Sequence, residues 1–166
     1  MKRYNAVVIG LGKIGMLYGF DKKRRQPASH ISAILANNKI NLLAVSDVDE
    51  NARQQFSKSY GSKIDVFSDY ADLVNKIKKE ENTDIIVLAT RDDQHYSMLR
   101  KIIKILNSYK KSLIIFCEKP LTRNTSDAKK IKKILTNKNI SIVVNHSRRW
   151  SKIWNKVHKQ IGRAHV

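Results

Sequence analysis

The sequence has few acidic residues, a single cysteine and no long apolar run. Its 166 residues include 33 Lys and Arg but only 14 Asp and Glu, a formal net charge of +19. One cysteine, Cys117, excludes an internal disulfide and fits a reducing compartment, so we expect a cytoplasmic protein. The longest apolar runs, 85–89 and 113–117, fall far short of the ~18 residues that indicate a membrane span. We therefore expect no membrane segment, and we expect no metal site.

The shortage of acidic residues is confined to one half of the chain. Residues 1–95 hold 15 basic and 12 acidic side chains, whereas residues 96–166 hold 18 basic and only two acidic ones, Glu118 and Asp127. Such a basic half raises nucleic acid, membrane surfaces and anionic substrates as partners. Most of these basic residues fall between the apolar positions of predicted helices, with no interleaved aromatics to stack on bases. Nucleic acid is therefore an unlikely partner, and a Lys-rich coding bias that loads solvated helix faces is the plainer alternative.

Short apolar runs alternate with helical patterns along the whole chain. This alternation is the signature of βαβ units, so we predict an α/β protein with a doubly wound parallel sheet and helices on both faces. The runs are rich in Val, Ile, Leu and Ala with almost no alternation, which predicts strands buried on both sides. The predicted strands are residues 4–9, 40–46, 64–67, 84–89, 113–117 and 140–144.

Three apolar stripes with helical spacing lie between the later strands. We expect each stripe to face the sheet. The helix after Pro120 is predicted to start at Asn124, a capping side chain, with Asp127 in its first turn. Residues 18–30 interrupt what would otherwise be one helix over 14–36, and they are interpreted as a loop insertion. The stripes comprise Leu73, Val74 and Ile77; Met98, Leu99, Ile102, Ile103 and Leu106; and Ala128, Ile131, Ile134 and Leu135.

A glycine motif directly follows the first predicted strand and precedes a helical pattern. In this G-x-G-x-x-G context, the first glycine permits a tight turn, the second lets the backbone approach a pyrophosphate, and the third allows close helix packing. Free N–H groups at the helix N-terminus would meet the phosphate charge. The motif predicts a dinucleotide site; a tight turn that binds nothing is the alternative. It reads Gly10-Leu11-Gly12-Lys13-Ile14-Gly15.

The second predicted strand ends at Asp47. A carboxylate there can accept hydrogen bonds from the adenine ribose hydroxyls and would repel a 2′-phosphate, which favours NAD. NADP stays open, because Lys13 and Arg53 lie near enough in sequence to soften that repulsion. Asp47 lies 32 residues after Gly15, more than the ~20 of the usual fingerprint, and the insertion accounts for the excess. Asp47 could instead cap the next helix together with Asp49.

Polar residues follow the fourth and fifth predicted strands. The fourth leads into Thr90 and His95, and the fifth into Glu118 and Lys119. Both ends lie on the same side of the sheet as the glycine loop, where doubly wound folds bind ligands. A lysine there can donate a proton to a substrate oxygen while the nicotinamide carbon exchanges hydride. For His95, a structural histidine is as good an interpretation as a cofactor contact.

Five segments in this order resemble one known family over essentially all of the chain. GLGKIG, Asp47, ATRDDQH, CEKPL and VVNHSRRW look like the glucose–fructose oxidoreductase/inositol dehydrogenase/rhizopine catabolism (Gfo/Idh/MocA) family, with EKP the most specific motif. The resemblance implies an N-terminal NAD(P)-binding Rossmann domain. It implies further that Lys119 is the catalytic lysine and Glu118 its neighbour at the cofactor. Thr90 and His95 match the nicotinamide-side loop, and Arg149 matches the segment that links two domains. Where the family usually has Thr-Pro-Asn, this chain has Thr90-Arg91-Asp92.

The same resemblance implies a second domain that is largely absent here. We predict a Rossmann domain over 1–147, and a linker helix with the start of a C-terminal α/β domain over 148–166. The apolar stripe Ile153, Trp154, Val157 and Ile161 would then be partly exposed. Two functions follow: an NAD(P)-dependent oxidoreductase of sugars, polyols or nucleotide sugars, or a stand-alone dinucleotide-binding module that catalyses nothing. A full-length form is expected to be a homo-oligomer.

Overall fold

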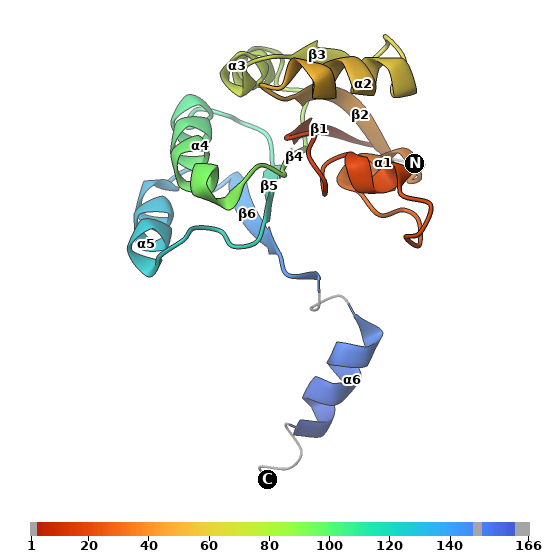
Figure 1. Ribbon diagram of the computed structural model, residues 1–166. Helices are drawn as coiled ribbons and strands as arrows, with labels where there is room; N and C mark the ends of the chain where they lie inside the picture. The colour runs from red at the N-terminus through yellow and green to blue at the C-terminus, as the bar shows by residue number, and fades with distance from the viewer. Residues whose placement is uncertain (1–2, 148–150, 162–166) are drawn as a thin grey trace.

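The computed structural model describes residues 3–147 and 151–161. Six parallel strands form one sheet in the order β3-β2-β1-β4-β5-β6 (Figure 1). The strand order reverses between β1 and β4, as in a doubly wound sheet, so the predicted fold class is confirmed. The strands are β1 (Tyr4–Ile9), β2 (Ile40–Ser46), β3 (Asp65–Phe67), β4 (Ile85–Leu88), β5 (Leu113–Glu118) and β6 (Ile140–Asn145). Every strand end lies within one residue of its predicted position.

Helices cover both faces of the sheet. One face packs against α1 (His30–Leu35) and α2 (Glu50–Tyr60), and the other against α3 (Tyr70–Glu80), α4 (Asp92–Ile105) and α5 (Thr125–Ile134). Alternate residues of β1 divide between the two cores, with Ala6 and Val8 on one side and Val7 and Ile9 on the other. This alternation explains why the central strands are apolar at every position.

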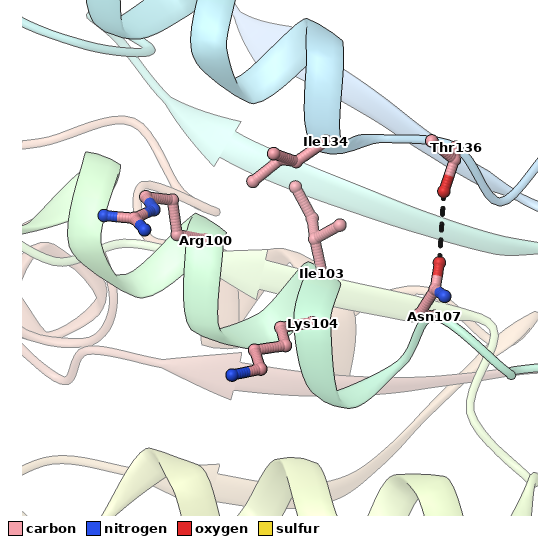
Figure 2. Close-up of a pocket in the computed structure, with 6 residues that line it drawn as sticks. All are labelled: Arg100, Ile103, Lys104, Asn107, Ile134 and Thr136. Atoms are coloured by element: carbon pink, nitrogen blue, oxygen red, sulfur yellow. Dashed lines mark hydrogen bonds between the residues drawn. The ribbon is translucent and has the colours of Figure 1, made fainter.

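The predicted apolar stripes of α3 and α4 are buried. Two other predictions were wrong: burial of β5 on both sides, and burial of the whole apolar stripe of α5. β5 alternates in burial, and its Ile114 is 41% exposed, so the strand is not buried on both faces. On α5, Ile131 is buried, whereas Ile134 is 37% exposed. Figure 2 shows Ile134 beside Ile103 in a surface cavity of about 360 Å³ between α4 and α5, which Arg100 and Lys104 also line.

Helix ends follow the capping chemistry of the sequence. The predicted start of α5 is confirmed, because the Asn124 side chain accepts a hydrogen bond from the N–H of Asp127. Asp49 caps α2 and Asp69 caps α3 in the same way. The predicted solvent-facing position of the basic residues on α4 and α5 is also confirmed, because Lys and Arg on these helices are exposed.

The last described helix, α6 (Lys152–Ile161), lies apart from the sheet in Figure 1. Ile153 and Trp154 are 74% and 47% exposed, so the predicted exposure of its apolar stripe is confirmed for these two residues. The side chain of Ile161 and residues 162–166 lie outside the described residues. None of the described helices is long and apolar enough to cross a membrane.

Candidate functional site

The glycine loop crosses the carboxyl ends of β1 and β4, and two of its glycines are required by packing. Gly10 has a φ of +101°, and a Cβ there would lie 2.7 Å from the backbone of Ala89. A Cβ on Gly15 would lie 2.0 Å from the carbonyl oxygen of Gly10. Gly12 differs, because a Cβ there would meet nothing within 4 Å. The fold therefore does not need a glycine at position 12, whereas close approach of a ligand to the backbone does.

The predicted helix does not follow the glycine motif directly. The chain makes one helical turn, in which the N–H of Met16 donates to the oxygen of Gly12, and continues into the 3-10 helix η1 (Leu17–Phe20). The helix α1 begins only at His30. There the N–H of His30 donates to Ile14 and that of Ile31 to Gly15. The insertion thus interrupts the helix after its first turn. Main-chain hydrogen bonds join that turn to α1, where the helix resumes.

This turn leaves backbone donors available for an anion. The N–H of Leu11 donates to Asp47, but within the described chain the N–H groups of Gly12, Lys13 and Ile14 have no acceptor. Neighbouring unpaired N–H groups beside a glycine without a side chain can bind a phosphate. The prediction of a pyrophosphate-binding loop is therefore supported by its geometry, although the donors come from a turn rather than from a long helix.

A cavity of about 740 Å³ opens above this loop. This volume lies within the ~300–1,000 Å³ range of ligand pockets. Its walls come from the glycine loop, η1, the end of β2 and the segment from β4 into α4. The predicted site residues that line it are Gly10, Leu11, Gly12, Lys13, Ile14, Asp47 and Thr90.

Asp47 joins two walls of the cavity. Its Oδ2 lies 2.6 Å from the N of Leu11, and its Oδ1 accepts the N–H of Asp49 at 2.9 Å. Asp49, not Asp47, caps α2, so the alternative of a helix cap does not apply to Asp47. The Arg53 guanidinium donates to the main-chain oxygens of Asp47 and Val48, and no Lys or Arg of the described residues forms an ion pair with the carboxylate of Asp47. Asp47 thus lines the cavity at the end of β2.

Sequence reasoning missed several polar residues of the cavity. Tyr18 belongs to the insertion, and its ring carries the Arg24 guanidinium 3.8 Å from its centroid. Tyr70 is the first residue of α3, and Arg91, Gln94 and Ser97 come from the start of α4. Only Arg91 gave a signal, as the departure from the Thr-Pro-Asn pattern.

His95 does not reach the cavity. It is 1% exposed, and its Nδ1 and Nε2 lie 2.7 Å and 3.1 Å from the carbonyl oxygens of Pro120 and Thr90. It therefore ties the end of β4 to the turn after β5, and the structural interpretation applies rather than the predicted cofactor contact. Burial raises the pKa of the adjacent Cys117 thiol to about 12. Gly15 likewise serves packing rather than lining the cavity.

Glu118 is held by two residues that sequence reasoning missed. Its Oε1 lies 2.8 Å from Nε2 of His30 and accepts a hydrogen bond of 2.7 Å from the Asn145 amide. Burial raises the pKa of the Glu118 carboxyl, but hydrogen bonds from His30 and Asn145 outweigh that effect, and its pKa lies below the usual range. Lys119 follows, exposed at the end of β5. Arg149 lies outside the described residues.

Comparisons with solved structures agree with this fold. Myo-inositol 2-dehydrogenase from Lactobacillus plantarum matches with a TM-score of 0.73 at 20% identity, over 99% of this chain and 42% of its own. The WlbA dehydrogenase from Bordetella pertussis, solved in complex with NADH and UDP-GlcNAcA, gives 0.73 at 20% identity over 98% and 42%. A probable dehydrogenase from Thermotoga maritima gives 0.71 at 19% identity over 96% and 41%. This chain thus spans about two fifths of the length of these neighbours.

The family comparison covers most of the chain. A search among curated proteins found no match. Residues 4–146 match the family described as "Oxidoreductase family, NAD-binding Rossmann fold" (GFO_IDH_MocA), a range that includes the glycine loop, Asp47 and Lys119. The chain therefore belongs to the Gfo/Idh/MocA oxidoreductase family and comprises its NAD-binding Rossmann domain.

Proposed function

We propose that this chain is the nucleotide-binding part of an NAD(P)-dependent dehydrogenase that acts on a hydroxyl or ketone of a sugar, polyol or nucleotide sugar. The observation that carries the proposal is the contrast among the three glycines. Gly10 and Gly15 are required by packing, whereas Gly12 faces open space beside unpaired N–H groups at the mouth of the cavity. A glycine that packing does not need is explained by a ligand that approaches its backbone.

The residues fit a dinucleotide from one end of the cavity to the other. The N–H groups of Gly12 and Lys13 would hold the pyrophosphate, Asp47 the adenine ribose, and Thr90 would lie on the nicotinamide side. The carboxylate of Asp47 favours NAD, with NADP as the alternative. The unpaired N–H groups of the turn carry a partial positive charge, which complements the negative charge of phosphate oxygens.

Lys119 is the proposed catalytic residue. The dinucleotide, when bound, supplies the nicotinamide ring that accepts or donates hydride. Lys119 follows β5 and is exposed; β5 pairs with β4, and the residues just after β4, Ala89 and Thr90, line the cavity. Its amino group can take the proton of a substrate hydroxyl, or return it to a carbonyl oxygen in the opposite direction. In the family resemblance this position carries the catalytic lysine.

Calorimetric titration with NAD⁺ tests the cofactor site. The wild-type chain should bind NAD⁺, and Gly12→Val should abolish binding while the unfolding temperature stays unchanged, because the added side chain occupies open space. Gly61→Ala is the opposite control: Gly61 has a φ of +82° and does not line the cavity, so this variant should lower the unfolding temperature and leave NAD⁺ affinity unchanged. Equal NAD⁺ affinity in wild type and Gly12→Val would contradict the proposed site.

The alternative function is a stand-alone module that binds NAD and catalyses nothing. This chain spans about two fifths of the length of its structural neighbours, so their catalytic activity is not carried over to it directly. A turnover assay with NAD⁺ across sugars and polyols separates the two. Turnover that Lys119→Met abolishes supports the dehydrogenase, whereas NAD⁺ binding without turnover supports the module.

The remaining assignments belong to the same proposal. We assign residues 1–147 to the Rossmann domain and 148–166 to a linker helix that leads into a C-terminal domain. The excess of positive charge in residues 96–166 favours an anionic substrate, such as a nucleotide sugar. A homo-oligomeric full-length form and a cytoplasmic location stay predictions.

A further inference from the structure

His30 connects the glycine loop to the strand end that carries the proposed catalytic lysine. Its main-chain N–H donates to the oxygen of Ile14 at 2.9 Å, so its backbone is bonded to the loop. Its side chain reaches Glu118, 88 residues away in sequence, at 2.8 Å. The ring also packs edge-on against Phe116, with 5.8 Å between centroids. With both side chains about 12–13% exposed, this contact is largely shielded from water.

The two oxygens of Glu118 are used unequally. Oε1 accepts from Asn145 and lies within hydrogen-bond distance of His30, whereas Oε2 accepts, among the residues that the structure describes, only the N–H of Lys119, at 3.4 Å. An ionised carboxylate has about four acceptor positions, so Oε2 retains capacity for another donor. His30 and Asn145 thereby fix the direction of the carboxylate without occupying its second oxygen.

Glu118 does not line the cavity itself, but its backbone lies next to a segment that does. β4 and β5 are paired so that Leu88 is opposite Cys117. Glu118 therefore continues β5 at the level where the neighbouring strand continues into Ala89 and Thr90, which line the cavity. Asp47 and the glycine loop form the other part of the cavity, across the reversal of strand order. Glu118 is thus on the nicotinamide side of the proposed dinucleotide position and away from the adenine side.

We propose that His30 is a positioning residue, which with Asn145 holds Glu118 as an ionised acceptor for a hydroxyl of the nicotinamide half of the dinucleotide. This assignment rests on the proposed function. It adds to the site a residue from the end of the insertion. Because the backbone of His30 is bonded to the glycine loop and its side chain to Glu118, His30 sets the distance between the pyrophosphate-binding loop and the end of β5.

Two ligands that share one half separate this role from general damage to the fold. NAD⁺ contains both halves, whereas ADP contains only the adenosine and pyrophosphate parts. Both are titrated calorimetrically between about pH 5 and pH 8 into wild type, His30→Phe, His30→Gln and His146→Phe. Phenylalanine keeps the ring against Phe116 but removes the hydrogen bond, and glutamine restores a donor. His146 is exposed and serves as the matched control.

The expected result is selective. His30→Phe should weaken NAD⁺ binding about tenfold, as expected for a lost hydrogen bond to a charged group, and leave ADP binding within about twofold. His30→Gln should regain most of the affinity, and His146→Phe should match wild type. On acidification, NAD⁺ affinity should fall at a higher pH in His30→Phe than in wild type, because Glu118 loses one of the two side-chain donors that favour its ionised form.

Results that contradict the role of His30 differ from those that contradict the proposed function. Unchanged NAD⁺ affinity in His30→Phe, or equal loss of NAD⁺ and ADP affinity, would overturn the role of His30 while leaving the cofactor site intact. Absence of both NAD⁺ and ADP binding in wild type would instead overturn the proposed function. Carbon-13 NMR of the Glu118 carboxyl in the ligand-free chain tests separately whether His30 stabilises the ionised form of Glu118. The same titration midpoint of Glu118 in wild type and His30→Phe would contradict that effect.

If His30→Phe does not fold, a second variant tests the same arrangement around Glu118. Asn145→Leu removes the other donor to Oε1 and should weaken NAD⁺ binding in the same selective way, with ADP binding retained. Glu118→Gln should also bind NAD⁺ more weakly, and the acid-dependent part of the affinity should disappear. An acid dependence that persists in Glu118→Gln would assign it to a different group and overturn the role of this carboxylate.

Discussion

The carboxylate of Asp47 accepts a hydrogen bond from the backbone N–H of Leu11, with 2.6 Å between Oδ2 and the nitrogen. This bond joins the end of β2 to the glycine loop at the end of β1. One charged side chain therefore both holds the loop and faces the cavity. Its removal should affect the choice of cofactor and the shape of the loop together.

Asp47→Ala should reduce the preference for NAD⁺ over NADP⁺. Loss of the carboxylate removes the repulsion of a 2′-phosphate and the acceptor for the ribose, so NAD⁺ affinity should fall about tenfold and the ratio of the two Kd values should approach one. Titration with both dinucleotides measures the ratio. Asp69→Ala is the matched control, because it removes the cap of α3, at a cost of about 1 kcal/mol, from a residue that does not line the cavity, and it should leave the ratio unchanged.

Gly15→Ala and Gly12→Ala should differ in stability. A Cβ added at Gly15 would lie 2.0 Å from a backbone oxygen, so the loop must shift, and we expect a loss of more than about 2 kcal/mol in the free energy of unfolding. A Cβ added at Gly12 would meet nothing within 4 Å, so the loss should stay within about 0.5 kcal/mol. Urea denaturation measures both, and equal losses would contradict the packing described for the loop.

Tyr109→Phe should destabilise the fold by about 1–3 kcal/mol. Tyr109 is 1% exposed, and its hydroxyl donates to the oxygen of Thr83 at 2.7 Å and accepts the N–H of the same residue at 3.2 Å. Phenylalanine would leave both buried backbone groups of Thr83 without that partner. Thermal and urea unfolding check the value. Tyr96→Phe, at a half-buried ring on α4, should cost much less, and a similar loss in both variants would contradict the buried hydrogen bonds.

Cys117 should resist thiol reagents in the native chain. Burial, together with the neighbouring Glu118 carboxylate, raises the pKa of this thiol to about 12, so the reactive thiolate is scarce at pH 8. Labelling with an aromatic disulfide should be at least about 100-fold slower in the folded chain than in guanidinium chloride. Equal rates would show that the β5 core opens readily. Rising pH should speed native labelling, because deprotonation begins only as pH approaches the raised pKa.

Local patterns were sufficient for the strands, for the cap of α5 and for the residues of the glycine loop. Short runs rich in Val and Ile and bounded by turn residues favour buried strands over helices because of their length and their β-branched side chains, so strand positions follow from composition and spacing. The exposed face of β5 could not be predicted. Ile114 is apolar like its buried neighbours, and its exposure depends on which helices pack over it, which its own sequence does not encode.

The sequence by itself determined the parallel α/β fold, the glycine loop and the carboxylate at the end of β2, because each depends on neighbours along the chain. Only the tertiary structure decided the contacts of His95 and His30. His95 faces two backbone oxygens behind the cavity, whereas His30, at the end of an irregular insertion, meets Glu118 from 88 residues away. Such contacts arise from where the insertion returns to its helix and from the order of strands, and no spacing rule connects residues so far apart.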